Sequence, residues 1–320
     1  MTPDGSRPVV ASVVVPAKDA AATLPRALAC LVAQQLEDGF EVIVVDDGSI
    51  DETPQIVEAA GPPVRLVSGA GLGAADARNR GVAAAAGDVL AFTDADCFAP
   101  PGWLAAGLDA MREADLIQGA VEPDPDTPPA GFDHTIVVPS RSALFETANL
   151  FVTRELFERV GGFEEIVDAG RAQGRFGEDA WFGWRATRTG ARTGFATKAV
   201  TYHARIRRSG REFVAERRRL RHFPALLVAI PEIRARRSVG WIFLSSQTAA
   251  FDIAVAGVFV AATTRSRLPL LAAAPYAASL KERVGTSRWA PRLAAVELAA
   301  DAIGLVALMR GSLEARTLLL

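Results

Sequence analysis

Cysteine is scarce in this sequence. Cys30 and Cys97 are its two cysteines in 320 residues, and they form no Cys-x-x-Cys spacing. This scarcity argues against a disulfide framework and against a cysteine-based zinc site, and it fits a reducing compartment. The N-terminus also lacks a basic segment followed by an apolar run of signal-peptide length, so we expect no export.

A large excess of charge of one sign is also missing, because the formal net charge is −2. Half of the residues are hydrophobic and 22% are charged. This composition is more apolar than is usual for a soluble enzyme but too polar for a polytopic transporter. We therefore expect the apolar residues to be concentrated in one part of the chain. A length of 320 residues allows one large domain or two modest ones with sizeable cores.

Short β-branched runs alternate with helical patterns near the N-terminus. The runs cover residues 9–15, 41–45, 64–67 and 89–93. This alternation predicts an α/β domain with a parallel sheet and helices on both faces. Ligands of such open sheets bind beyond the carboxyl ends of the strands, where the polar motifs of this sequence lie. The proline-rich, acidic segment 121–140 is predicted to be a mobile loop between two halves of the domain.

Three acidic motifs could carry chemistry. The D-D-G-S motif at 46–49 offers acceptors for a nucleobase or a ribose hydroxyl, although it could also be a plain turn. The D-A-D motif at 94–96 places two carboxylates on one side of the chain, which suits Mg²⁺ or Mn²⁺, yet solvated acidic turns are common. The E-D motif at 178–179 opens a predicted helix, where acidic residues also complement the helix dipole. Each motif alone is ambiguous.

The order of the motifs is more specific than any one of them. PAKDA at 16–20, ARNRG at 77–81 and GGF at 161–163 accompany the acidic motifs. This arrangement resembles the inverting family-2 glycosyltransferases of the GT-A fold, as found in bacteria, and the resemblance covers about residues 9–205. It implies a Rossmann-like, nucleotide-sugar-binding, mostly parallel sheet flanked by helices, with a C-terminal helical appendage after it.

The resemblance also implies a division of the chain. A catalytic domain would occupy residues 1–205, with a nucleotide-binding half at about 9–120 and an acceptor half at 121–205. Residues 206–320 would form a basic and hydrophobic helical region that associates with a membrane.

Roles for individual residues follow from the resemblance. The nucleotide sugar would contact Ala17, Asp19, Asp47, Arg78 and Asp94. The acceptor site would include Gly161, Gly162, Phe163 and Glu178. A divalent cofactor, Mn²⁺ or Mg²⁺, would be held by Asp96 and His203, although a histidine after an apolar strand is often structural. Asp179 would be the catalytic base.

The implied reaction is a single displacement with inversion. Asp179 would remove a proton from an acceptor hydroxyl while that oxygen attacks the anomeric carbon from the face opposite the nucleotide. The metal would stabilise the charge on the leaving diphosphate. The alternative is a catalytically inactive nucleotide-sugar-binding protein or membrane scaffold of the same fold. Retention of the D-A-D and E-D motifs argues against that alternative.

A glycine-rich segment at 69–73 also imitates part of a dinucleotide-binding motif. Its spacing is G-x-G-x-G rather than G-x-G-x-x-G, and it follows the third predicted strand rather than the first. A dehydrogenase is therefore disfavoured.

The C-terminal third combines arginines with apolar stretches. Residues 205–237 hold eleven arginines against three glutamates, with few aromatic residues between them, so we expect membrane phosphates rather than nucleic acid as the partner. Residues 239–262 are long enough to span a bilayer, but Asp252 lies near their middle. In the last apolar stretch, Glu297 and Asp301 form an acidic stripe, which fits helices lying on a membrane or packing against each other.

These features predict peripheral or monotopic attachment to the cytoplasmic face of the cell membrane, with one inserted helical hairpin as the alternative. The implied partners are a nucleotide-diphosphate sugar, with a UDP-sugar the commonest donor among similar enzymes, and a lipid-linked or cell-envelope glycan as acceptor. The bacterial membrane surface would be the third partner.

Overall fold

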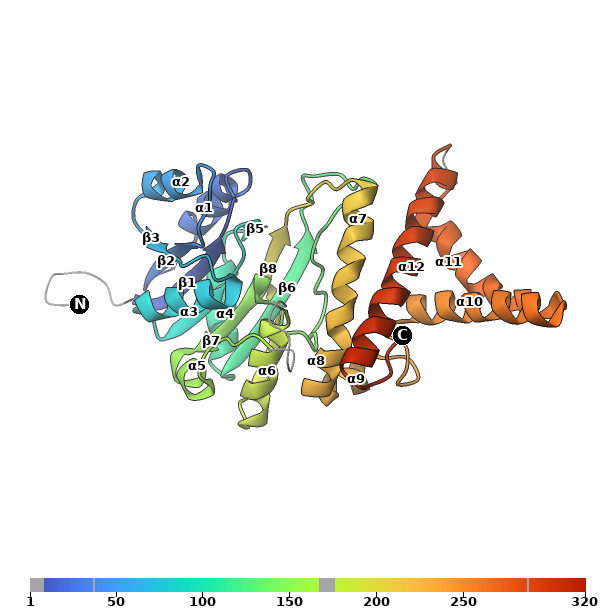
Figure 1. Ribbon diagram of the computed structural model, residues 1–320. Helices are drawn as coiled ribbons and strands as arrows, with labels where there is room; N and C mark the ends of the chain where they lie inside the picture. The colour runs from blue at the N-terminus through green and yellow to red at the C-terminus, as the bar shows by residue number, and fades with distance from the viewer. Residues whose placement is uncertain (1–8, 37, 167–175, 287) are drawn as a thin grey trace, which may run out of the picture. The chain divides into compact units, whose positions relative to one another are not determined.

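The computed structural model describes residues 9–36, 38–166, 176–286 and 288–320. Residues 1–8 and 167–175 of the predicted catalytic domain therefore lie outside the described residues. The chain divides into two compact units (Figure 1). The first unit is formed by most of the chain up to Ile206, and the second by Arg207–Leu320 together with the short segment Ala130–Asp133.

The first unit is built on an eight-stranded mixed sheet with the order β3-β2-β1-β4-β7-β6-β8-β5. The strands are β1 Val9–Ala17, β2 Gly39–Asp46, β3 Val64–Ser68, β4 Val89–Phe92, β5 Cys97–Phe98, β6 Leu116–Pro123, β7 Leu150–Thr153 and β8 Thr193–His203.

The predicted α/β architecture is confirmed, but the sheet is only partly parallel. The first four strands of the order pair in parallel, as does β6 with β8. The pairings β4 with β7, β7 with β6, and β8 with β5 are antiparallel. The βα alternation of the first 93 residues explains the parallel part, because each crossover helix returns the chain to the same edge.

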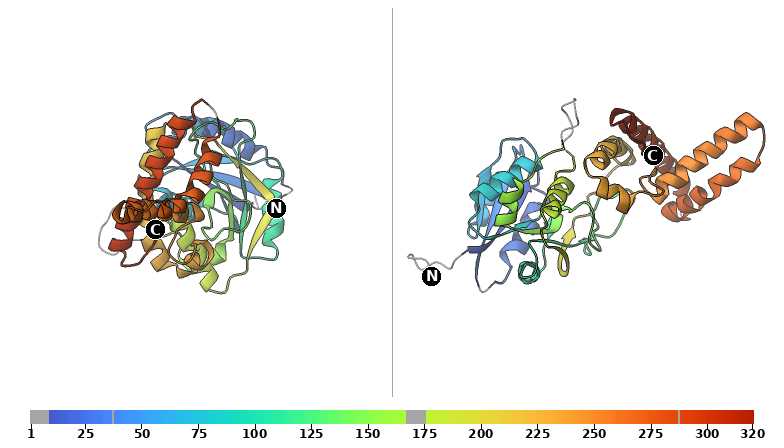
Figure 2. Two further views of the ribbon diagram at one scale, coloured as in Figure 1. Left: turned by 90° about the vertical axis from the view of Figure 1, so that its right-hand side faces the viewer. Right: turned by 90° about the horizontal axis from the view of Figure 1, so that it is seen from below.

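Helices cover both faces of this sheet (Figures 1 and 2). The helices of the first unit are α1 Leu24–Val32, α2 Thr53–Ala60, α3 Ala74–Ala84, α4 Trp103–Met111, the 3₁₀ turn η1 Thr147–Asn149, α5 Arg154–Val160 and α6 Glu178–Arg188. Double coverage explains why β1 has a continuous apolar run: Val13, Val14 and Val15 point to alternate faces, and all three are fully buried.

A buried asparagine fixes the irregular middle of the sheet. The amide nitrogen of Asn149 donates to the carbonyls of Ala120, at 2.7 Å, and Ala199, at 2.8 Å, while its oxygen accepts from the Trp103 indole at 2.9 Å. The register between β6 and β8 shifts at this point, between Gly119 and Ala120. Asn149 therefore satisfies carbonyls that the strand ladder leaves open and anchors η1 beside the site described below.

The second unit is helical, as predicted for the C-terminal region. Its helices are α7 Gly210–Glu216, η2 Arg217–His222, α8 Phe223–Ala229, α9 Pro231–Arg237, α10 Ser246–Thr264, η3 Leu268–Ala273, α11 Ala274–Val284 and α12 Ala290–Glu314. α10 and α11 lie side by side as a hairpin joined through η3 (Figure 2).

The apolar stretch 239–262 is not one continuous helix. The helix α10 begins at Ser246, where Ser245 and Thr248 form a capping box, and Trp241 before it has a positive φ of 65°. Among the described residues, α10 is the one helix long and apolar enough to cross a membrane. In its most apolar stretch, 22% is buried inside the protein. This is weak support for a span, because core helices of soluble proteins can have the same length and composition.

The acidic stripe of α12 faces other helices. The Asp301 carboxylate accepts hydrogen bonds from Gln247 and Tyr276, each at 2.8 Å, and pairs with Arg283 at 3.0 Å. Glu297 also pairs with Arg283. Of the two interpretations of this stripe, helix packing within the unit therefore accounts for Glu297 and Asp301.

Candidate active site

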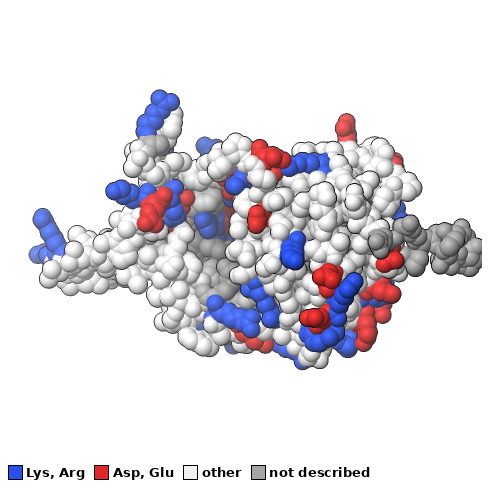
Figure 3. Space-filling model, turned by 180° about the vertical axis from the view of Figure 1, so that it is seen from behind, with Lys and Arg blue, Asp and Glu red and all other residues white. Residues whose placement is uncertain are grey.

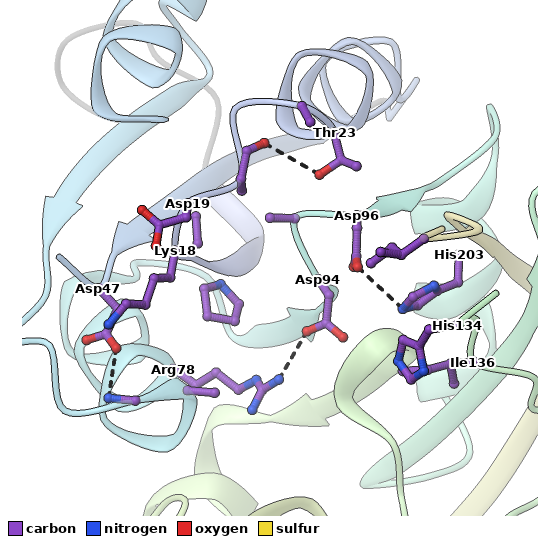
Figure 4. Close-up of a pocket in the computed structure, with 18 residues that line it drawn as sticks. Lys18, Asp19, Thr23, Asp47, Arg78, Asp94, Asp96, His134, Ile136 and His203 are labelled. Atoms are coloured by element: carbon purple, nitrogen blue, oxygen red, sulfur yellow. Dashed lines mark hydrogen bonds and ion pairs between the residues drawn. The ribbon is translucent and has the colours of Figure 1, made fainter. Parts of the chain in front are cut away.

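A cavity of about 700 Å³ opens beyond the carboxyl ends of several strands of the first unit (Figure 4). Ala17 ends β1, Asp94 and Asp96 follow β4, and His203 ends β8, so the carboxyl ends of these strands meet at the same edge of the sheet. The cavity is lined by Pro16, Ala17, Lys18, Asp19, Ala20, Ala22, Thr23, Asp47, Gly73, Ala74, Arg78, Asp94, Ala95, Asp96, His134, Ile136, His203 and Ile206.

The two aspartates of the D-D-G-S motif have different surroundings. Asp46 accepts a hydrogen bond from the Ser49 amide at 3.1 Å and so forms a local turn. Asp47 is 4% exposed, and its Oδ2 accepts from the Gly73 amide at 2.8 Å. Its buried Oδ1 accepts no hydrogen bond from the described residues. A buried carboxylate oxygen without a donor, in a residue that lines a cavity, suits a nucleobase N–H.

The glycine-rich segment 69–73 supports this aspartate. A Cβ at Gly69 would lie 2.7 Å from the Asp46 carbonyl oxygen, so any larger residue there would collide with the backbone of the D-D-G-S turn. The Gly73 amide also bonds Asp47 directly. Gly69 thus serves close packing against the D-D-G-S turn, and Gly73 holds Asp47 through its amide, which accounts for these two glycines without a dinucleotide.

Asp19 connects the loop after β1 with the D-D-G-S turn. Its amide donates to the Ser49 hydroxyl at 2.9 Å, and its carboxylate accepts from the Ile50 amide at 2.8 Å. Its φ of 48° is left-handed, a conformation that aspartate and asparagine adopt more readily than most residues. Asp19 therefore shapes the rim of the cavity.

Asp96 and His203 converge at the opposite side of the cavity (Figure 4). Asp96 Oδ2 lies 3.6 Å from His203 Nε2, and His203 Nδ1 is 2.8 Å from the Ala204 carbonyl oxygen. A proton on Nδ1 satisfies that carbonyl and leaves the Nε2 lone pair facing Asp96. Burial raises the pKa of Asp96, and nearby Asp94 adds to this effect.

These residues fit a hard divalent ion. Asp96, Cys97 and His203 each place a possible ligand atom within 4.8 Å of the others. Burial raises the pKa of the Cys97 thiol well above its usual value, and a soft sulfur suits Mg²⁺ or Mn²⁺ poorly. The usable donors are one carboxylate and one imidazole, with substrate phosphate oxygens to complete the shell.

Arg78 joins three carboxylates from two other segments. It is 5% exposed, and its Nη2 lies 3.0 Å from Asp94 Oδ1. Its Nη1 lies 3.2 Å from Glu178 Oε1 and 3.5 Å from Asp179 Oδ1. The structure therefore brings together the arginine of A-R-N, the first aspartate of D-A-D and both residues of E-D.

Asp179 is held from a second direction by Thr147. Its Oδ2 accepts from the Thr147 amide at 3.0 Å and from the Thr147 hydroxyl at 2.9 Å. Its buried Oδ1 accepts no hydrogen bond from the described residues. Burial raises the pKa of Asp179 to about 7, against the lowering effect of Arg78. Oδ1 faces Arg78 Nη1 at 3.5 Å without a hydrogen bond. A carboxyl with such a pKa can act as a general base near neutral pH.

The GGF motif forms the turn that ends α5. Gly161 and Gly162 both have positive φ, of 86° and 73°. The side-chain amide of Asn79 makes two hydrogen bonds with the backbone of Phe163, the residue after Gly162. It donates to the Phe163 carbonyl at 2.8 Å and accepts from the Phe163 amide at 2.9 Å. Phe163 is 3% exposed, and its ring packs against Phe182 of α6, so this ring anchors the turn to that helix.

Several residues near the site carry no signal that we could interpret from the sequence. Thr147, which holds Asp179, lies in a turn without a motif. His134 comes from the proline-rich segment 121–140, lines the cavity, and stacks edge-to-face on His203 at 5.9 Å. Asn79 belongs to the A-R-N segment, but its contact with the GGF turn is visible only in the folded chain.

Comparison with known proteins agrees with this geometry. Residues 12–162 match the family described as glycosyl transferase family 2. Residues 12–162 belong to glycosyl transferase family 2. This segment starts in β1 and ends in the GGF turn, and it contains the D-D-G-S, A-R-N and D-A-D motifs.

Two named relatives are each similar to 60% of this chain. Glycosyltransferase AglE of Haloferax volcanii is 28% identical in an alignment of 207 residues, which covers 66% of that protein. Pre-mycofactocin glycosyltransferase of Mycobacterium tuberculosis is 29% identical in an alignment of 216 residues, which covers 42% of that protein. The chain thus spans about two thirds of the first relative and less than half of the second.

A solved structure shows the same fold. The mannosyltransferase PcManGT from Pyrobaculum calidifontis, in complex with GDP-Man and Mn²⁺, superposes with a TM-score of 0.63 at 20% identity. The match covers 94% of this chain and 90% of that one. The predicted GT-A fold is therefore confirmed.

Proposed function

We propose that this chain is a metal-dependent, inverting glycosyltransferase that moves a sugar from a nucleotide-diphosphate sugar to an acceptor hydroxyl. One observation carries the proposal: the guanidinium of Arg78 binds both Asp94, on the D-A-D side of the cavity, and Asp179, a carboxyl with a pKa of about 7. A candidate base and a candidate donor site thus share one cation. The match of residues 12–162 to glycosyl transferase family 2 supports the same reaction class.

Asp47 and the loop after β1 form the proposed nucleotide site. The open Oδ1 of Asp47 would accept from the nucleobase, with Ala17 and Asp19 beside it and Asp94 near the ribose or diphosphate. We propose a uridine diphosphate sugar as donor, following the resemblance of the motifs. The complex of PcManGT with GDP-Man and Mn²⁺ supports a nucleotide sugar and a divalent metal without specifying the base.

The proposed chemistry assigns one role to each end of the site. Asp179 accepts the proton of the acceptor hydroxyl while that oxygen bonds to the anomeric carbon, and the bond from this carbon to the diphosphate breaks. Thr147 donates two hydrogen bonds to Oδ2, so the proton would go to Oδ1, which faces Arg78 Nη1 at 3.5 Å but accepts no hydrogen bond from the described residues. Asp96 and His203 would hold the metal, which supplies positive charge to the leaving diphosphate. Glu178 and the turn Gly161–Phe163 would border the acceptor.

We also propose that the second unit attaches the protein to a membrane from the cytoplasmic side, peripherally or as a monotopic protein. An inserted hairpin is the alternative. Residues 253–281 contain no acidic residue and carry Arg265, Arg267 and Lys281. The hairpin that includes them is mostly uncharged on the face shown in Figure 3. A lipid-linked or cell-envelope glycan of a bacterium is the acceptor that such attachment would favour.

The function is tested with the purified full-length chain, a panel of nucleotide sugars and Mn²⁺, with release of nucleotide and transfer to lipid-linked acceptors as readouts. We expect Asp179→Asn to lower turnover by about 10²–10⁴-fold, while donor-induced thermal stabilisation is kept. Asp96→Asn should lose the Mn²⁺-dependent part of that stabilisation. Asp76→Asn, on the outer side of α3, is the matched control.

Two outcomes would count against the proposal. Wild-type turnover in the Asp179→Asn variant would remove Asp179 as the base. Donor binding without transfer or hydrolysis in the wild-type protein, across the whole panel, would favour the alternative of an inactive nucleotide-sugar-binding protein or scaffold.

A further inference from the structure

Arg78 has an environment that a simple ligand of the nucleotide does not need. Its side chain is 6% exposed, and three carboxylates surround it. Asp94 comes from the loop after β4, whereas Glu178 and Asp179 open α6, with Glu178 lying 100 residues after Arg78 in the chain. One buried cation is therefore the contact between the donor side of the site and the proposed base.

The contacts use separate ends of the guanidinium. Nη2 faces Asp94, and Nη1 faces Glu178 and Asp179. Because the guanidinium is planar and rigid, these contacts set the distance and the direction from Asp94 to the pair Glu178 and Asp179. A lysine ammonium at the same place would supply the charge but not this fork.

The support of Arg78 is equally rigid. It lies on α3, and the next residue, Asn79, binds the backbone of Phe163 on both sides. The Phe163 ring lies 5.8 Å from the Arg78 guanidinium. The A-R-N segment thus connects α3 to the D-A-D loop, to the start of α6 and to the GGF turn.

We propose that Arg78 is a positioning residue: it holds the base Asp179 and the donor-side carboxylate Asp94 in one fixed geometry, rather than acting mainly as a ligand of the nucleotide. The proposal rests on the proposed function, since it takes Asp179 as the base. It differs from the role that the sequence resemblance implies, in which Arg78 contacts the nucleotide sugar.

Charge around Asp179 provides a readout that a purely structural role would not move. The groups that face Asp179 are Arg78 from α3, Glu178 from its own helix, Asp94 from the loop after β4, and Thr147 from η1. Arg78 lowers the pKa of Asp179, while Glu178 and Asp94 raise it. Without the guanidinium, the base would keep its proton to higher pH, and the acidic limb of the rate profile would move to higher pH.

The experiment compares Arg78→Gln and Arg78→Lys with the wild-type protein, in the presence of Mn²⁺ and the best donor. The readouts are kcat and KM across pH, with nucleotide-diphosphate affinity measured by calorimetry. We expect Arg78→Gln to lower kcat by about 10²-fold, as a misplaced catalytic group does, and to move the acidic limb to higher pH. Donor KM should change by less than about threefold, because loss of an interaction made mainly in the transition state lowers kcat.

Arg78→Lys separates charge from geometry. It should restore the acidic limb, because a cation is present again, but leave kcat well below wild type, because the fork is gone. This variant also decides the question if Arg78→Gln does not fold: wild-type kcat in Arg78→Lys would overturn the proposal. Arg80→Gln, on the same helix but paired with Asp76 at the surface, is the control and should match the wild type.

The opposite result is equally clear. A kcat near the wild-type value together with a donor KM raised tenfold or more would make Arg78 a nucleotide ligand. Failure of the proposed function would be seen separately, because Asp179→Asn would then retain wild-type turnover whatever the Arg78 variants do.

Discussion

Within each acidic motif, neighbouring residues do different work. Asp46 forms a turn with Ser49, while Asp47 presents an open oxygen. Asp94 is neutralised by Arg78, whereas Asp96 faces His203. The structural and the functional interpretation of a motif can therefore both be correct, each for a different residue.

The elevated pKa of Asp179 predicts a trade between stability and activity. Burial raises this pKa to about 7 in the folded protein, from an ordinary value of 3.8. Because this pKa is higher in the folded than in the unfolded protein, the Asp179 carboxyl makes its full contribution to folding stability below about pH 4. That contribution is lost as the pH rises through about 7, where the buried carboxyl ionises. Transfer shows the opposite trend, because the base must be ionised to accept a proton.

We therefore expect Asp179→Asn to melt at a higher temperature than the wild type at pH 8, with the difference shrinking at pH 5. Wild-type turnover should rise with pH through about 7. Thermal unfolding at both pH values, without donor or metal, and a pH-rate profile check this. An equal difference in melting temperature at pH 5 and pH 8 would contradict the role of burial.

Among the secondary-structure elements, the end of α5 is constrained both by its backbone conformation and by close packing. Gly162 has a φ of 73°, and a Cβ there would lie 2.8 Å from Asn79 Oδ1 and 3.3 Å from the Phe157 ring. Gly190, after α6, has a φ of 84° and nothing within 4 Å of such a Cβ. The pair separates the cost of backbone conformation from the cost of collision.

Gly190→Ala should therefore destabilise the protein by about 1–2 kcal/mol, the usual cost of a left-handed conformation for a residue with a Cβ. Gly162→Ala should cost more, because Asn79 would also have to release the GGF turn. Urea unfolding of the two variants measures the difference. Similar losses in both would mean that the collision at Asn79 is relieved at no cost.

For the molecule as a whole, the second unit carries the open question of the membrane. Phe259, Leu268 and Leu271 of the α10–α11 hairpin are 69%, 75% and 72% exposed. Large apolar side chains gathered on one element, without acidic neighbours, fit insertion into the interface of an anionic bilayer.

We expect the wild-type protein to float with vesicles that contain anionic lipid. The double variant Phe259→Glu with Leu271→Glu should bind at least about tenfold more weakly, since burying one large apolar side chain is worth about 1.5–3 kcal/mol. Ile50→Glu is the matched control, because Ile50 is 94% exposed on the first unit. Release by a carbonate wash would indicate peripheral attachment, and a need for detergent would indicate insertion. Recovery of all the protein in the soluble fraction without either treatment would contradict the membrane proposal.

The predictability of the fold follows the distance over which its contacts reach. Apolar periodicity and glycine placement are local, so strands β1 to β4 and the start of α6 were predictable to within a few residues. The antiparallel insertion of β7 between β4 and β6 depends on Asn149, whose hydrogen bonds reach Trp103, Ala120 and Ala199 across the sheet. Such a pattern leaves no periodic trace.

The sequence by itself determined the class of the protein, because the ordered motifs and the βα alternation are both written in local residue types. Only the tertiary structure decided what each residue of the site contacts. Arg78 and Glu178 are hydrogen-bonded although they lie 100 positions apart in the sequence, and Thr147 and Asp179 are hydrogen-bonded across 32 positions. Contacts of that range exist only after the sheet has brought its strand ends to one edge, since no local preference encodes them.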